Sequence, residues 1–139
     1  MNATRQHIIQ VARTWLLTPY HHHARINGVG VDCVQFLIAV FEECQIASAV
    51  AEGYAQDWHL HRSEEKYLAG IQHYAQQTTS PEPGDVALFR FGRCVSHAGI
   101  LLPEPRTVIH AFAGSGVILS SLDGQELAGR LHSFWQVVR

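Results

Sequence analysis

The pattern of apolar and turn residues changes at residues 78–85, and this change constrains the fold more than any other feature of the sequence. This segment reads TTSPEPGD, and its prolines and glycine interrupt regular helices and central strands. Before it, apolar residues recur at helical spacing; after it, the chain consists of short β-rich segments separated by turn residues. Helices followed by an antiparallel meander indicate an α+β fold, which we assign to a single domain over residues 1–139.

The spacing of apolar residues predicts the individual elements. We expect helices over residues 4–17, from Asp32 or Cys33 onward, and over 63–77, with a loop over 18–30 between the first two. The expected strands are residues 86–91, 96–102, 107–112 and 116–120, with a last strand in the tail HSFWQVV.

Composition and charge exclude several classes of protein. A formal charge of −2 gives no general attraction to nucleic acid or anionic membranes. No apolar run approaches the roughly 20 residues of a membrane span, and the N-terminus lacks the features of a signal peptide. We therefore expect no nucleic-acid partner, no membrane insertion, and synthesis in the cytoplasm without export by a signal peptide of the chain's own.

The stretch NGVGVDCVQF, residues 27–36, places a cysteine directly after an acid at the expected start of a helix. Asp32 is a good N-cap residue. A thiol in the position of Cys33 faces unsatisfied N–H groups, which favour the thiolate, lower the pKa and offer an oxyanion hole. Buried packing is the alternative reading for any free cysteine. Three cysteines without CxxC spacing argue against a disulfide framework.

A thiol nucleophile requires a histidine base and a third group to orient it. Of ten histidines, His97 and His110 differ from the rest because each lies inside a short apolar strand. Together with Cys33 they would also make an open three-ligand zinc site, but their spacing matches no metal signature. The cluster at residues 21–23, made of His21, His22 and His23, is interpreted as a surface cluster or an adventitious metal site.

Three segments in this order carry a family resemblance: TPYHHHARINGVGVDCVQFL, then PGDVALFRF with SHAGILL, then VIHAF. They resemble the NlpC/P60 family of cysteine peptidases, and within it the branch of phage tail-associated cell-wall peptidases. The resemblance spans roughly residues 8 to 120 and implies a papain-like domain that hydrolyses amide bonds in peptidoglycan stem peptides, typically next to a diamino acid.

The resemblance also implies roles for individual residues. Cys33 matches the nucleophile, His97 the general base and His110 the orienting residue, while Tyr20 matches a tyrosine that lies near the nucleophile in relatives. The Cys33 amide, helped by Tyr20, would stabilise the oxyanion. Gln35 departs from the family pattern, because it replaces a glycine that follows the nucleophile, and this bears on the shape of the substrate cleft.

We therefore read the chain as a thiol hydrolase that needs no cofactor or metal, with a peptidoglycan peptide as substrate and phage tail proteins as partners. A phage tail or other machinery would deliver the protein to the cell wall. Two alternatives stay open: a tail-assembly or binding module that keeps the fold with little activity, and a thiol amidase or acyltransferase acting on a non-wall substrate.

The sequence also predicts the geometry of the site. If the strands that carry His97 and His110 are joined by a loop over residues 102–105, Leu101 pairs with Arg106 and the two histidines are directly opposed. We expect both imidazoles on the sheet face that meets the Cys33 helix. The Cys33 sulfur should lie within about 4 Å of one His97 ring nitrogen, with His110 near the other.

Overall fold

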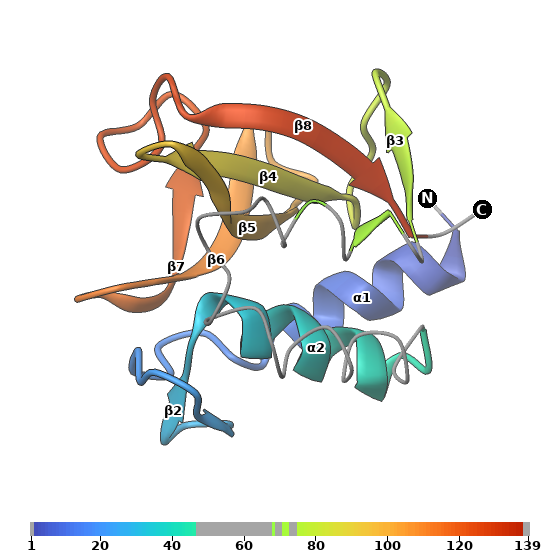
Figure 1. Ribbon diagram of the computed structural model, residues 1–139. Coiled ribbons are helices and arrows are strands. Elements are labelled where there is room, and N and C mark those ends of the chain that lie inside the picture. The colour runs from blue at the N-terminus through green and yellow to red at the C-terminus, as the bar shows by residue number, and fades with distance from the viewer. Residues whose placement is uncertain (1, 47–67, 69–70, 73–74, 138–139) are drawn as a thin grey trace.

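The two helices of the described chain lie together on one face of an antiparallel sheet in the computed structural model of the protein (Figure 1). The structure describes residues 2–46, 68, 71, 72 and 75–137. In chain order its elements are α1 (Ala3–Arg13), β1 (Arg25–Ile26), β2 (Gly30–Val31), α2 (Cys33–Glu43), β3 (Gln76–Thr78), β4 (Val86–Phe91), β5 (Cys94–Leu101), β6 (Thr107–Phe112), β7 (Gly116–Ser121) and β8 (Leu131–Gln136). The predicted α+β class is confirmed.

None of the described helices has the length and apolar character needed to cross a membrane.

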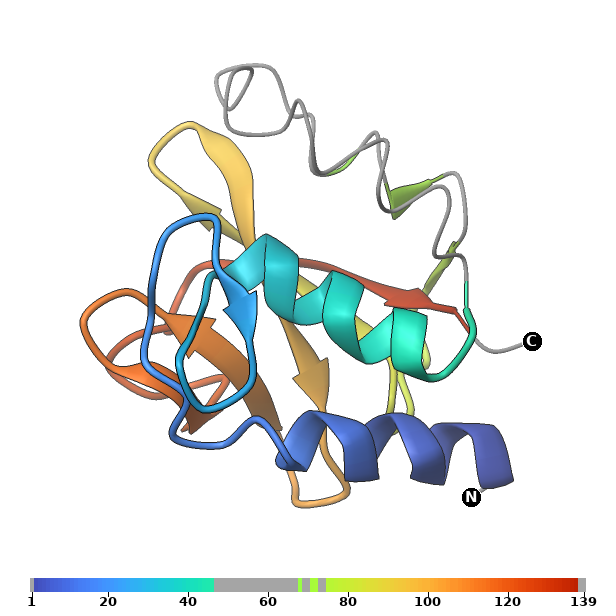
Figure 2. The ribbon, with the colours of Figure 1, turned by 90° about the horizontal axis from the view of Figure 1, so that it is seen from below.

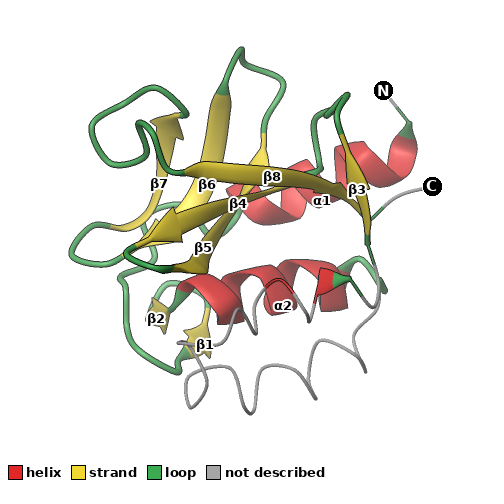
Figure 3. Ribbon diagram, turned by 45° about the horizontal axis from the view of Figure 1, so that its top comes forward, coloured by secondary structure: helices red, strands yellow, loops and turns green. Residues whose placement is uncertain are grey.

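Within the described residues the main sheet has six strands, in the order β3-β8-β4-β5-β6-β7. Strands β4 to β7 form the predicted meander, with each strand antiparallel to the next. The last strand, β8, returns to the other side of β4 and joins β3 to the sheet (Figure 3). Strands β1 and β2 form a separate small hairpin beside the start of α2.

The sheet has apolar side chains on both faces. One face packs against α1 and α2, which lie across it as two neighbouring helices (Figure 2). This larger core includes Phe36 and Phe41 of α2 with Ile100 and Ile109 of the sheet, all but excluded from solvent. A smaller cluster occupies the opposite face and consists of Ala87, Phe89, Leu101, Val108, Leu122 and Leu127.

Three element predictions need correction. Helix α1 ends at Arg13 instead of residue 17, because Leu17 turns into the left-handed region (φ 70°) and donates its N–H to the Val117 carbonyl of β7. The predicted loop over 18–30 contains β1 and the start of β2. Most of the helix predicted over 63–77 lies outside the described residues, and its predicted last two residues begin strand β3.

The predicted pairing of β5 with β6 is wrong by two residues. Leu101 pairs with Val108, not with Arg106, and Ile100 pairs with Ile109. The ladder is extended by the Leu102 N–H, which donates to the Thr107 carbonyl while the Leu102 side chain stays buried. The turn therefore begins one residue later, at Pro103, and Arg106 belongs to it with a left-handed φ of 51°. Burial of one more leucine thus shifts the register.

The expected sheet face of the two histidines is also wrong. Side chains alternate along a strand, and Ala98 and Ile100 of β5 belong to the core beneath α2. Leu101, by contrast, belongs to the cluster on the opposite face. His97 shares the alternation of Leu101, and His110 shares that of Val108, so both imidazoles fall on the face opposite the body of α2. Beyond the two pairs of the β5–β6 ladder, His97 nevertheless lines a pocket together with Cys33 at the start of that helix.

Candidate active site

The start of α2 is held by the side chain of Asp32. This residue has the extended backbone of an N-cap, and its Oδ1 accepts a hydrogen bond from the Gln35 N–H at 2.8 Å. Its Oδ2 accepts a second bond, at 2.7 Å, from the backbone N–H of His23. One buried carboxylate therefore caps the helix and fastens the preceding loop across it. The result is that Cys33 is the first residue of the helix, as the pattern predicted.

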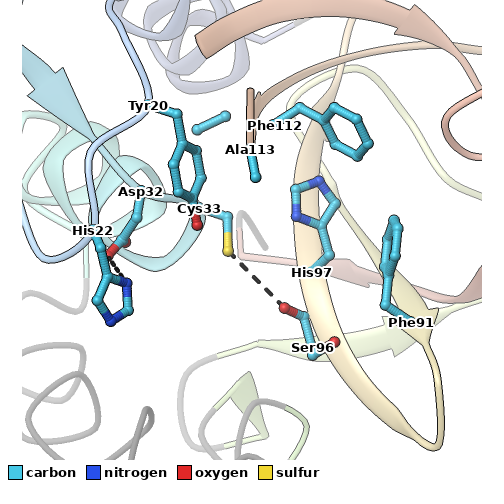
Figure 4. Close-up of a pocket in the computed structure, with 10 residues that line it drawn as sticks. Tyr20, His22, Asp32, Cys33, Phe91, Ser96, His97, Phe112 and Ala113 are labelled. Atoms are coloured by element: carbon cyan, nitrogen blue, oxygen red, sulfur yellow. Dashed lines mark hydrogen bonds and ion pairs between the residues drawn. The ribbon is translucent and has the colours of Figure 1, made fainter. Parts of the chain in front are cut away.

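Cys33 opens into a pocket of about 250 Å³ (Figure 4). The pocket lies between the start of α2 and the strands β5 and β6, whose ladder comprises only the two pairs at Ile100 and Leu101. The Cys33 thiol lies 3.9 Å from the Ser96 carbonyl oxygen of β5. Figure 4 shows the thiol and the His97 ring on facing walls of the pocket. The pocket is lined by Tyr20, His22, Asp32, Cys33, Phe91, Ser96, His97, Ala111, Phe112 and Ala113.

A chain of short hydrogen bonds runs from the pocket into the protein. His97 Nε2 lies 2.8 Å from His110 Nδ1, and His110 Nε2 lies 2.8 Å from Ser120 Oγ on β7. All three side chains are buried. Because Nε2 of His97 is engaged by His110, its Nδ1 is the nitrogen left for chemistry in the pocket. The expectation that His110 approaches a ring nitrogen of His97 is met, although by a different pairing of the strands.

Gly99 makes the contact between the two histidines possible. Continuing the observed register by one residue sets His110 opposite Gly99, so His97 and His110 are diagonal neighbours. Diagonal neighbours are roughly 7–8 Å apart, with their Cβ atoms somewhat closer, which is still farther than for directly opposed residues. A Cβ added to Gly99 would lie 3.2 Å from the His110 Cβ and 3.2 Å from the Ile109 carbonyl oxygen. The absent side chain leaves room for His110 to lean toward His97.

Aromatic side chains surround the His97 ring. Phe91 and Phe112 meet it edge-on, with ring centroids at 5.4 and 5.9 Å, and Phe89 lies behind it at 5.8 Å. Phe112 also contacts the His110 ring at 5.4 Å. These contacts restrict the orientation of the imidazole and leave His97 only 7% exposed.

Burial determines the protonation of the cysteine and the histidine. It raises the pKa of the Cys33 thiol to about 12, and the charge of Asp32 acts in the same direction. The N–H groups of Cys33 and Val34 oppose this shift, as expected at a helix start, but the loss of solvent outweighs them. Burial, followed by the charge of His110, lowers the pKa of His97 to about 3. The expected low thiol pKa is therefore not found: burial favours the neutral thiol and the neutral imidazole.

Two side chains of the segment before α2 complete the pocket wall. Figure 4 shows Tyr20 beside Cys33, and burial, with the charges of Cys33 and Asp32, raises the pKa of the Tyr20 phenol. The phenol therefore stays protonated and can donate a hydrogen bond. His22 lines the pocket near Asp32, with its Nδ1 3.8 Å from the carboxylate, and stacks on His23 with centroids 3.8 Å apart.

No group of three or more metal-ligating side chains among the described residues is arranged to hold a metal ion. The cluster at 21–23, interpreted as a surface cluster or an adventitious metal site, is exposed, and its member His22 also lines the pocket. Gln35, the departure from the family pattern, is not among the pocket-lining residues and touches the site through its backbone bond to Asp32.

The structure thus brings together the predicted residues Tyr20, Asp32, Cys33 and His97 around one pocket, with His110 directly behind it. Sequence reasoning missed Gly99, Ser120 and the aromatic residues around His97. The pairing of the strands brings Ser120 and Gly99 next to His110, and no sequence pattern marks either residue. Phe91 and Phe112 end apolar strand segments, which is a weak signal for a pocket rim.

An α+β domain with a cysteine at the start of a helix and histidines on an adjoining antiparallel sheet is the papain-like architecture. The sequence profile of the NlpC/P60 family matches residues 17–136, and the chain therefore belongs to this family. No match was found among curated protein sequences.

Solved structures with the same fold are distant in sequence. A lipoprotein-like protein of the NLP/P60 family from Staphylococcus aureus is 18% identical with a TM-score of 0.70; the alignment covers 100% of this chain and 43% of that protein. The NlpC/P60 domain of the peptidoglycan hydrolase SagA is 19% identical with a TM-score of 0.63, covering 98% of this chain and 99% of that one. An NlpC/P60 family protein from Bacillus cereus is 16% identical with a TM-score of 0.65, covering 94% and 39%. The chain thus spans less than half of the first and third of these proteins.

Proposed function

We propose that the chain is a cysteine peptidase that hydrolyses amide bonds in peptidoglycan stem peptides. One observation carries the proposal: Cys33, at the start of α2, shares a pocket with His97, whose Nε2 is held by His110. Membership of the NlpC/P60 family and the name of one fold relative, a peptidoglycan hydrolase, support the choice of substrate.

The neutral resting pair dictates the order of the proton steps. As the sulfur of Cys33 attacks the amide carbonyl carbon, its proton passes to His97 Nδ1, so that the thiolate never accumulates. The Cys33 N–H and the Tyr20 hydroxyl donate to the developing oxyanion. His97 then gives the proton to the leaving amine nitrogen as the C–N bond breaks, leaving a thioester on Cys33.

Water completes the reaction. His97 accepts a proton from water as the water oxygen attacks the thioester carbonyl, and the C–S bond breaks with return of the proton to Cys33. His110 holds the orientation of the His97 ring through both halves of the reaction, through the contact between His97 Nε2 and His110 Nδ1.

Digestion of purified peptidoglycan, with the released peptides identified by mass spectrometry, tests this proposal. We expect wild-type protein to release stem-peptide fragments and both Cys33→Ala and Cys33→Ser to release none, with folds unchanged by circular dichroism. Cys44→Ala is the matched control, because Cys44 is a thiol at the opposite end of α2 and does not line the pocket. Binding of peptidoglycan by the wild type without any release would instead favour a binding module.

A finer part of the proposal concerns where the protein acts. The motifs resemble those of the phage tail-associated branch, and on that resemblance we propose a peptidase that a phage tail delivers to the wall. Mass spectrometry of purified virions tests this part separately. If the chain is absent from tails but hydrolyses peptidoglycan in vitro, the proposed activity stands and the proposed delivery by a phage tail is wrong.

A further inference from the structure

The line of hydrogen bonds behind the pocket does not end at His110. Ser120 Oγ lies 2.8 Å from His110 Nε2, and the serine is 7% exposed. Ser120 belongs to β7, where it pairs with Val108, while His110 pairs with Ile118. The hydroxyl therefore reaches its partner diagonally across two strands, as His110 itself reaches His97 on the other side.

We propose that Ser120 is a positioning residue that accepts a hydrogen bond from His110 and thereby sets the tautomers of both histidines. This inference deepens the proposed function and rests on it for its catalytic consequence. Its structural part concerns only where two protons lie in the resting protein.

The chain of contacts allows two arrangements of protons. In the first, His110 carries its proton on Nε2 and donates to Ser120, its Nδ1 accepts from the Nε2–H of His97, and His97 Nδ1 is left with a free lone pair. In the second, Ser120 donates to His110 Nε2, and His110 donates from Nδ1 to His97. His97 must then carry its own proton on Nδ1, the nitrogen that serves the pocket.

Only the first arrangement gives a working base. With a lone pair on Nδ1, His97 can take the proton of Cys33; with a proton there, it cannot. Once His97 is doubly protonated, its Nε2–H needs an acceptor, and His110 supplies one only if its own proton is on Nε2. The first arrangement therefore persists throughout the reaction, provided that Ser120 accepts the Nε2–H of His110.

Loss of the hydroxyl favours the wrong arrangement. In Ser120→Ala either tautomer of His110 leaves Nε2 without a partner, but an orphaned buried N–H is tolerated less readily than an orphaned acceptor. The proton then moves to Nδ1, where His97 accepts it, and His97 becomes protonated on the side that faces Cys33. The fold has no other reason to change, because serine and alanine differ by one atom.

Kinetics on a stem-peptide substrate give the first test. We expect Ser120→Ala to lower kcat roughly 10- to 100-fold with KM within about twofold of wild type. Ser120→Thr keeps the hydroxyl and should retain kcat within about fivefold. The control is Ser133→Ala, which removes another buried sheet hydroxyl, one that accepts from Trp135 Nε1 at 2.8 Å, and should leave kcat unchanged.

The ¹⁵N NMR shifts of the ring nitrogens give a second test that needs no activity, with His97 and His110 assigned from single His→Gln variants. We expect both rings to be Nε2–H tautomers in the wild type, and His110 to shift to Nδ1–H in Ser120→Ala. An Nδ1–H tautomer of His110 in the wild type would overturn the inference, as would an unchanged kcat and tautomer in Ser120→Ala. If the expected tautomers appear but the wild type cleaves no peptide, the inference stands and the proposed function fails.

Discussion

Replacing Gly99 with alanine tests whether the space beside His110 is what allows the two histidines to meet. The added Cβ would lie 3.2 Å from both the His110 Cβ and the Ile109 carbonyl oxygen, and 3.3 Å from the Val108 Cβ. These distances are a few tenths of an ångström too short for comfortable contact, so β6 and its histidine must move away. The bond of 2.8 Å between His97 Nε2 and His110 Nδ1 would lengthen by a similar amount.

The expected cost follows from these contacts. Weakening one buried hydrogen bond costs about 1 kcal/mol, which corresponds to roughly a five- to tenfold loss of kcat. Overpacking of the sheet should destabilise the fold by about 1–3 kcal/mol. We would measure kcat on a stem-peptide substrate and the free energy of unfolding in urea.

A matched variant separates the two effects. Ala12→Val adds volume to a fully buried position of α1, in the core on the helix side of the sheet, and should cost comparable stability without lowering kcat. An unchanged kcat in Gly99→Ala would refute the argument that the missing side chain positions His110. Equal losses of kcat in both variants would refute it as well, because they would point to general destabilisation.

Four further predictions follow from single contacts. At pH 7, iodoacetamide should modify Cys33 more slowly than the more exposed Cys94, as measured by mass spectrometry. The Cys33 rate should rise toward pH 12, because burial raises the thiol pKa to about 12 and the reactive thiolate forms only as the pH increases. Faster labelling of Cys33 than of Cys94 at pH 7 would instead indicate a thiolate–imidazolium pair. Asp32→Ala removes the N-cap of α2 and should lower the free energy of unfolding by about 0.5–2 kcal/mol. Arg5→Met leaves the buried Asp85 without its partner at 2.6 Å and should cost about 3–5 kcal/mol, so urea unfolding indistinguishable from wild type would contradict the importance of this ion pair. EDTA should leave peptide release unchanged, since the proposed relay uses only protons; activity lost in EDTA and restored by zinc would support a metal site.

Local sequence determined most of the elements. The helix from Cys33 follows from an apolar stripe and the capping preference of Asp32, and the strands β4 to β8 follow from β-rich segments between turn residues. Such signals act within a few residues, so they can be recognised without knowledge of the fold. Cys33, His97 and His110 were identifiable for the same reason, because a thiol after a cap and polar residues in apolar strands are local anomalies.

Tertiary structure decided how those residues meet. The register of β5 against β6 depends on the burial of Leu102, which lies in the core formed with the helices, and no local pattern specifies it. A shift of two residues keeps side chains on the same face but changes their partners. For that reason the two histidines meet diagonally over Gly99, and His110 in turn reaches Ser120.

The protonation of the site likewise could not be predicted from the sequence. A helix start predicts a low thiol pKa, and the N–H groups of Cys33 and Val34 do act in that direction. Burial of the same thiol acts against them and is the larger effect, because a charge loses more by leaving water than it gains from two backbone dipoles. Whether a thiol at a helix start is exposed or buried depends on what packs over it, and here that is a sheet contributed by residues more than 60 positions along the chain.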